Sequence, residues 1–197
     1  MTARRIVLCF ILTLAFTGCG FLSKKPNHFY SLDTIPPAAA AAATLAGVPS
    51  GGLPIGIDGV ELPPGLDRRG MVTRGADHQV QIKGTHEWAA PLEDMVIHTL
   101  AFDLANRLPE GMVVLPGQAK PGAMRAVYVI FEDLAPGPDN VFVLDARWTL
   151  TESDAPEVTR HERITVNMTS AEPTAIAAAM SQALAALAER MVGVNRN

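Results

Sequence analysis

Residues 88–108 read WAAPLEDMVIHTLAFDLANRL, and this stretch decides the fold. Apolar residues recur in it at four-residue steps, at Leu92, Val96, Leu100, Leu104 and Leu108. Steps of four place side chains on one face of an α-helix. Pro91 suits the first turn, and Glu93 and Asp94 follow where the helix dipole favours acidic groups. We therefore expect a helix from about residue 91 to residue 108, with one buried face.

Downstream of this helix lie three segments with strand patterns and then a second amphipathic segment. Residues 126–131 are apolar on both faces, as in a central strand, whereas 142–150 and 163–168 alternate between apolar and polar. Turn residues at 136–140 and 153–157 predict an antiparallel meander. Pro173 then begins a helix that ends at Gly193, with an apolar stripe at Ile176, Met180, Leu184, Leu187 and Met191.

Upstream of the first helix lie short strand patterns at residues 28–32 and 55–62, and a hairpin pattern with strands at 71–73 and 80–82. Residues 36–54 are mostly Ala, Gly and Pro without a usable period, which predicts a flexible insertion. The order is strands, helix, three strands, helix. It predicts an α+β fold, a two-layer sandwich whose two amphipathic helices pack on one face of a mostly antiparallel sheet.

The N-terminus has the pattern of a secretory signal peptide. Arg4 and Arg5 precede an apolar run at residues 6–16, which is shorter than the roughly 18–20 residues of a membrane span. Small residues before Cys19 are similar to a bacterial lipobox, so we predict cleavage between Gly18 and Cys19 and acylation of the Cys19 thiol. The alternative is an ordinary signal peptide with an incidental cysteine. The predicted organisation is a signal peptide at 1–18, a lipid-anchored spacer at 19–27, a single domain at 28–193 and a tail at 194–197.

Composition narrows the class of function. The chain has 16 basic and 20 acidic side chains and a formal net charge of −4, which argues against nucleic-acid binding. Cleavage would remove Cys9, and lipidation would consume the thiol of Cys19, so no disulfide could form within the mature chain. Its stability must then come from a hydrophobic core.

Motifs that would indicate catalysis are missing from the sequence. There is no nucleophile elbow, phosphate-binding glycine loop or His-Glu-x-x-His pattern. His86-Glu87 and His161-Glu162 are adjacent pairs, but neighbours on a strand point to opposite faces, so we expect neither pair to bind a metal. Asp103 remains an acid/base candidate. We expect no enzyme activity, no metal site, and no cofactor besides the covalent lipid on Cys19.

Several short motifs follow one another in a characteristic order. Phe29-Tyr30-Ser31-Leu32 comes soon after Cys19; Val60-Glu61-Leu62-Pro63 leads into Leu66-Asp67-Arg68 and Met71-Val72-Thr73-Arg74; and Glu87-Trp88 leads into the helix. In this order and spacing they resemble the ABC-type transport auxiliary lipoproteins of the PqiC kind.

The resemblance implies a periplasmic protein tethered to the outer membrane. Its relatives serve systems built from an ATPase, a permease and a protein with MCE domains, which move lipids between the inner and outer membranes. The lipoprotein would perform no chemistry and would dock the MCE-domain protein, as a homo-oligomeric ring of several copies. Gly20 stands where an Asp would signal retention in the inner membrane, which agrees with outer-membrane sorting.

Exposed loops with Pro, Gly and paired arginines are available for recognition, so contacts with the partner or between copies are expected around residues 63–74 and Trp88. The candidate contact residues are Leu62, Pro63, Leu66, Asp67, Arg68, Arg69, Arg74 and Trp88. For Trp88 and Trp148, packing in the core is the default and an interface is the alternative. Two other functions stay open: a structural subunit of an outer-membrane secretion or assembly complex, and a periplasmic carrier that holds one lipid in its own cavity.

Overall fold

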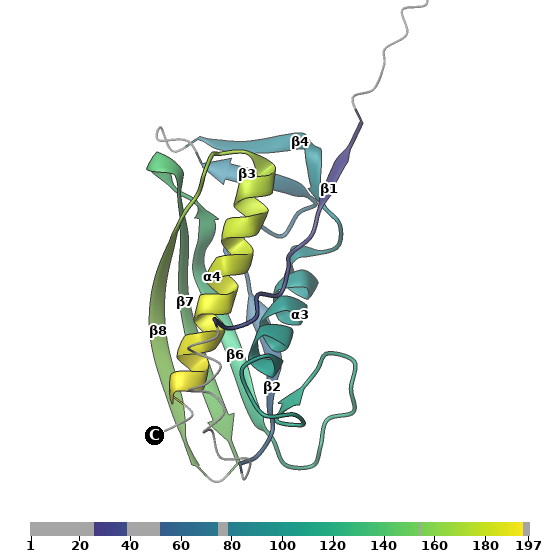
Figure 1. Ribbon diagram of the computed structural model, residues 1–197, viewed down its shortest axis with the longest axis vertical. Helices are drawn as coiled ribbons and strands as arrows, with labels where there is room; N and C mark the ends of the chain where they lie inside the picture. Colours follow the sequence, from purple (N-terminus) through teal and green to yellow (C-terminus); the bar gives the residue numbers. More distant parts are fainter. Residues whose placement is uncertain (1–25, 39–51, 75–78, 154, 195–197) are drawn as a thin grey trace, which may run out of the picture.

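The computed structural model describes residues 26–38, 52–74, 79–153 and 155–194. Within these ranges two α-helices, α3 (Leu92–Ala105) and α4 (Pro173–Val194), lie on one face of a five-stranded sheet (Figure 1). That sheet has the order β5-β2-β6-β7-β8, with bounds Val113–Val114, Ile55–Glu61, Arg125–Pro136, Val141–Glu152 and Ala155–Asn167. The predicted α+β class and the helical layer are confirmed.

The large sheet joins two kinds of strand pairing. Strands β6, β7 and β8 form the predicted antiparallel meander, and a short 3-10 turn at Pro138–Asn140 connects the first two. Strand β2 instead runs parallel to both β6 and β5, with Ile55 opposite Arg125 and Val113. The parallel pairing requires a long crossover, which here contains two strands of a second sheet, α3 and β5.

A second, three-stranded sheet lies across one end of the molecule, at the top of Figure 1. It has the order β1-β4-β3, with bounds His28–Tyr30, Val80–Trp88 and Gly70–Arg74. Strands β3 and β4 are the predicted hairpin, and β1 is parallel to β4. The register shifts between Gly70 and Met71, so that Gly70 pairs with Glu87 while Met71 pairs with Lys83.

Helix α3 buries the predicted stripe. Leu92 is 2% exposed, and Val96, Leu100 and Leu104 are completely buried. Pro91 is the N-cap residue instead of a member of the first turn, and Glu93 and Asp94 occupy that turn as expected. The helix ends at Ala105, and Leu108 is buried just beyond it.

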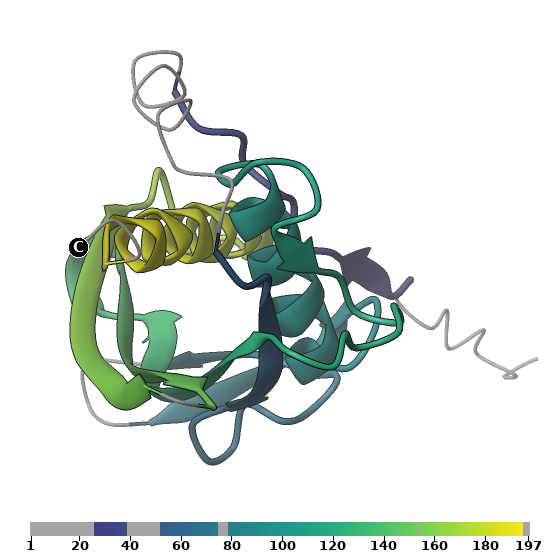
Figure 2. The same cartoon turned by 90° about the horizontal axis from the view of Figure 1, so that it is seen from below.

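Helix α4 is the central covering element of the large sheet. Its stripe residues are buried, and so are alanines between them, including Ala179, Ala183 and Ala188, whose small side chains allow close packing. The segment Pro173–Gly193 is long and apolar enough to cross a membrane, but 67% of its most apolar window is buried inside the domain, as in the core helix of a folded protein. Figure 2 shows α3 and α4 lying over the same face of the curved sheet.

The core fills the space between the two layers. From the sheet, Val127, Val129, Phe142 and Leu144 are completely buried, and they face the helices. Burying each such side chain stabilises the fold by about 1.5–3 kcal/mol. The domain is therefore held together by a continuous apolar interior.

Both tryptophans lie in the core, whereas the large sheet leaves some large apolar side chains on its outer face. Trp88 is 3% and Trp148 1% exposed, so both rings pack in the core. Strand β6 is central, as predicted, but only one of its faces is covered by the described residues: Tyr128 and Ile130 point outward, 44% and 39% exposed. The expectation that both apolar faces of this strand are buried was therefore wrong, because both helices lie on the opposite face.

Some predictions fall outside the described residues. Gly18 and Cys19 belong to this group, as do residues 39–51 of the predicted insertion at 36–54 and the last three residues of the tail. Of the insertion, residues 36–38 and 52–54 are described.

Candidate functional site

The loop between β2 and β3 projects charged side chains from a buried base. Pro63 and Leu66 are buried, whereas Asp67, Arg68 and Arg69 are exposed. The Leu66 N–H donates to the Pro63 carbonyl at 3.1 Å, and the Arg68 N–H donates to the Leu66 carbonyl at 2.8 Å. These tight bonds form successive turns that hold the three charged residues outward.

Gly65 has φ +91°, a backbone conformation that residues with a Cβ rarely adopt. The loop is also joined to the small sheet, because the Trp88 N–H donates to the Arg69 carbonyl at 2.7 Å. This bond brings the loop beside the segment that leads into α3.

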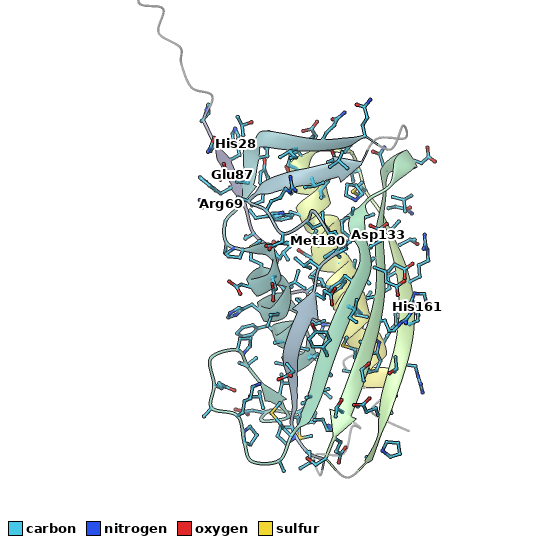
Figure 3. All side chains as sticks on the ribbon, turned by 180° about the vertical axis from the view of Figure 1, so that it is seen from behind. His28, Arg69, Glu87, Asp133, His161 and Met180 are labelled. Atoms are coloured by element: carbon cyan, nitrogen blue, oxygen red, sulfur yellow. The ribbon has the colours of Figure 1, made fainter. Side chains whose placement is uncertain are left out.

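An open pocket of about 540 Å³ lies between the loop and the N-terminus of α3. Its walls are Asp67, Arg68 and Arg69 on one side and residues 89–92 on the other. The Arg69 Nε is 3.9 Å from the Glu87 Oε2, and the Arg69 side chain is 76% exposed, so this ion pair contributes little. The Arg69 guanidinium is therefore accessible to an acidic group from outside, and Figure 3 shows Arg69 beside Glu87 and His28 at this end of the molecule.

The candidate contact residues divide into a buried and an exposed group. Pro63, Leu66 and Trp88 are buried and Leu62 is half-buried, so in the isolated chain they shape the loop. Asp67, Arg68 and Arg69 are exposed, and Arg74 is the last residue of β3. Which of them contact a partner remains a prediction.

A second group of polar residues fastens the segment after β1 across the helices, and we call residues 31–38 the strap (Figure 1). Asp103 Oδ1 accepts a hydrogen bond from the Ile35 N–H at 2.8 Å, and the Arg107 guanidinium donates to the Ile35 carbonyl at 3.0 Å. From α4, the Ser181 Oγ accepts a bond from the Asp33 N–H at 3.1 Å. The strap is thus held by side chains from both helical segments.

Asp103 and Arg107 form a buried ion pair, 0% and 2% exposed, with Arg107 Nη1 3.6 Å from Asp103 Oδ1. Burial raises the pKa of Asp103 from 3.8 to about 6, against the opposing effects of the Ile35 hydrogen bond and the Arg107 charge. Arg107 also donates to the Asp103 carbonyl at 2.9 Å and to Glu189 at 3.2 Å. Among the described residues, the second oxygen of Asp103 has no hydrogen-bond partner.

This geometry explains Asp103 by its structural contacts. Its oxygen binds the strap, and its charge faces a buried cation. The sequence analysis missed Arg107, whose only local signal is its position beside Leu108 of the apolar stripe.

A third cluster lies on the outer face of the large sheet, where Glu132, Asp145 and His161 place ligand atoms within 4.8 Å of one another. His161 Nε2 is 2.5 Å from Asp145 Oδ1. Both carboxylates also bind arginines: Arg163 donates to Asp145 at 2.6 Å and Arg147 donates to Glu132 at 3.0 Å. Because two guanidiniums balance the two carboxylates, the cluster is best described as a cross-strand ion-pair network.

The neighbouring pair His161-Glu162 behaves as the sequence predicted. His161 contacts Asp145 on the outer face, whereas Glu162 accepts a hydrogen bond from Arg190 of α4 at 2.9 Å. The two side chains therefore lie on opposite faces of β8.

The fold and these sites define a two-layer α+β domain with a fastened strap and an exposed arginine loop at one end. The family profile described as the ABC-type transport auxiliary lipoprotein component matches residues 30–192. The chain belongs to this family, and it is accordingly a lipoprotein component that is auxiliary to ABC-type transport.

Solved structures show the same fold. A crystal structure of an uncharacterized protein is 17% identical and has a TM-score of 0.70, with 86% of this chain and 99% of that chain covered. A crystal structure of a protein from Xanthomonas campestris is 15% identical and has a TM-score of 0.64, with 84% and 93% covered. No curated protein matches the chain significantly.

Proposed function

We propose that this protein is a non-catalytic docking subunit, anchored in the outer membrane by a lipid on Cys19, of an MCE-type ABC system that moves lipids between the two membranes. The observation that carries the proposal is the family match over residues 30–192. The lipobox pattern at Gly18-Cys19 supports the anchor, and the lack of an Asp after Cys19 supports outer-membrane sorting.

The mechanism is multivalent tethering. Lipid anchors hold several copies on one surface, so weak contacts to an MCE-domain partner add together through a high effective concentration. The loop at Asp67, Arg68 and Arg69 supplies contacts between copies or with the partner, because its guanidiniums are exposed around a pocket next to α3. In this arrangement the domain serves as a rigid connector.

The two alternatives make different demands on the molecule. A secretion or assembly subunit would differ in its partner and not in its fold. A lipid carrier needs a cavity between sheet and helices, but in the described residues this space is occupied by side chains such as Val129, Leu144 and Leu184, all completely buried. The packed core therefore argues against a lipid held between the large sheet and α4.

The decisive experiment is crosslinking in cells, followed by purification of the lipidated protein, identification of its partners by mass and sizing of the complex. We expect an MCE-domain protein and a multiple of the monomer mass. Recovery of a secretion channel would support the second function, and a bare monomer carrying a lipid would support the carrier.

Charge reversal tests the loop. Arg68→Glu combined with Arg69→Glu is expected to reduce the size of the purified complex. Arg160→Glu, on the exposed edge strand β8, is the matched control and should leave the size unchanged. If the double variant assembles like the wild type, the loop does not join the copies.

The anchor is tested separately with Cys19→Ala. This variant should be folded and soluble, and it should no longer fractionate with membranes. Continued recovery in the outer-membrane fraction would contradict anchoring through Cys19.

A further inference from the structure

The most exposed large apolar side chains of the described residues gather on the small sheet at one end of the domain. Phe29 of β1 and Val80 of β4 are each 58% exposed, and Ile82 of β4 is 51% exposed. We call these three residues the apolar end. Large exposed apolar side chains on one small sheet indicate a surface that can contact something else.

The residues of the apolar end lie on neighbouring strands of the small sheet, near the two ends of β4. Val80 and Ile82 are two positions apart on β4, so they project from the same side of the strand. Ile82 lies directly against the backbone of β3, because a Cβ placed on Gly70 would come within 2.7 Å of its Cγ2. Phe29 stands opposite Glu87 near the other end of β4.

The chain itself indicates what this end faces. The described chain begins at Pro26, immediately before β1, and Cys19 stands seven positions earlier. Seven residues span at most about 25 Å when fully extended. The lipid on Cys19 therefore keeps β1 and its sheet within a short distance of the bilayer surface.

The opposite end of the domain lies farther from the lipid anchor than the small sheet does. Helix α4 has 22 residues and is therefore about 33 Å long. It begins near the small sheet and runs away from it (Figure 1). The tether thus selects the end that carries the exposed apolar side chains.

Charge at this end is compatible with a lipid surface. Lys24 and Lys25 lie in the tether, and Lys83 of β4 is next to Ile82. The Lys83 ammonium itself donates to the Ala171 carbonyl at 3.3 Å and lies opposite buried Met71, so it is on the other side of the strand from Ile82. Basic and apolar side chains together are typical of protein surfaces that rest in the interfacial region of a bilayer.

We propose that the apolar end rests on the membrane that holds the lipid anchor, with Phe29, Val80 and Ile82 in the headgroup region of the bilayer. This inference rests on the anchor at Cys19 in the proposed function. The contact fixes the long axis of the domain away from the membrane, so that every anchored copy stands in the same orientation and presents its flank to its neighbours.

The test uses the lipidated mature protein in liposomes of phosphatidylethanolamine and phosphatidylglycerol. Lipidation consumes the Cys19 thiol, so an introduced cysteine can be labelled uniquely with an environment-sensitive fluorophore. The label is placed at Ile82→Cys or, as a control at the far end, at Ala119→Cys, which is also exposed. Quenching by lipids that carry a nitroxide near the headgroup is expected to be several-fold stronger at position 82.

A second pair of variants distinguishes quenching that depends on the apolar side chains from quenching that depends on the lipid tether alone. With the label at Gln81→Cys, replacing Val80 and Ile82 by Ser should reduce quenching several-fold. Replacing Tyr128 and Ile130 by Ser, on the exposed face of β6, is the matched control and should leave quenching at position 81 unchanged. Circular dichroism is used to check that both double variants are folded.

The outcomes distinguish this inference from the anchor on which it rests. Protein that floats with the liposomes but is quenched equally at positions 82 and 119 would overturn the membrane contact and leave the anchor intact. Protein that does not float would overturn the anchor. A third outcome is that the label at position 82 is not quenched by lipid nitroxides but becomes buried when the complex forms. This result would assign the apolar end to a second copy or a partner, and it would also overturn the inference.

Discussion

The buried carboxyl group of Asp103 makes the stability of the domain depend on pH. Its pKa is raised from 3.8 to about 6, so between these values the folded chain binds more protons than the unfolded chain. Stability from this group is therefore full below about pH 4 and falls as the pH rises through 6. Each pKa unit corresponds to 1.36 kcal/mol, so a shift of about two units predicts a loss of about 3 kcal/mol.

The substitution Asp103→Asn isolates this effect because the amide does not titrate in this range. Its carbonyl oxygen can still accept the hydrogen bond from the Ile35 N–H. Urea unfolding of both proteins, in the soluble Cys19→Ala background, gives the difference between their free energies of unfolding at each pH. Between pH 4 and pH 7 we expect this difference to move by about 3 kcal/mol in favour of the Asn variant.

The control for this prediction is a strap contact without a titrating group. Ser181→Ala removes the acceptor of the Asp33 N–H, and its difference from the wild type should stay nearly constant over the same range. If the wild type and Asp103→Asn instead gave parallel stability curves from pH 4 to pH 7, the raised pKa and the reasoning from burial would be refuted.

Further substitutions test the strap and the core. Arg107→Met removes the cation beside Asp103 and should lower the free energy of unfolding by about 3–5 kcal/mol at pH 7, with a smaller loss at pH 5 where the carboxyl is protonated; an equal loss at both values would contradict the pairing. Ser181→Ala removes the acceptor of the Asp33 N–H and should cost about 1 kcal/mol, with faster hydrogen exchange at that amide. Unchanged exchange would show that the bond does not protect the strap. Trp148→Ala should cost about 3–5 kcal/mol in urea unfolding, because its ring is 1% exposed, and a cost below that of an exposed substitution would contradict its place in the core.

The helices and the meander could be predicted because their signals are local. The stripe from Leu92 to Leu104 repeats within one helix, and the stripe of α4 does the same. Turn residues set the limits of β6, β7 and β8. The strands extend further than the alternating patterns, since hydrogen bonding continues to the turns beyond the last buried side chain: β8 spans Ala155–Asn167, where the pattern indicated 163–168.

The division into two sheets had no comparable local signal. Strand β2 pairs with β6 and not with the hairpin that follows it. Ile55 lies opposite Arg125, 70 positions later in the chain, and nothing in the sequence of either strand specifies such a distant partner. The pairing of β1 with β4 is again a distant contact, with His28 opposite His86.

The candidate site was predictable only at the level of the loop. Pro, Gly and paired arginines correctly indicated an exposed segment, and the structure shows Asp67, Arg68 and Arg69 at its surface. The hydrogen bonds that hold the strap were not predictable, because they join distant parts of the chain. Ile35 is 68 positions from Asp103, and Asp33 is 148 positions from Ser181. Within α3, Asp103 resembles any other acidic residue.

The parallel pairing of β2 with β6 also sets the order in which the chain can fold. Strands β6, β7 and β8 meet after closing only short loops, whereas β2 must wait for a partner that follows about 70 residues later. The C-terminal half is thus expected to form the nucleus, and the earlier-synthesised β2 joins an existing sheet. Apolar positions of β2 such as Ile55 and Val60 stay exposed until then, so this strand is where slow folding would first lead to aggregation.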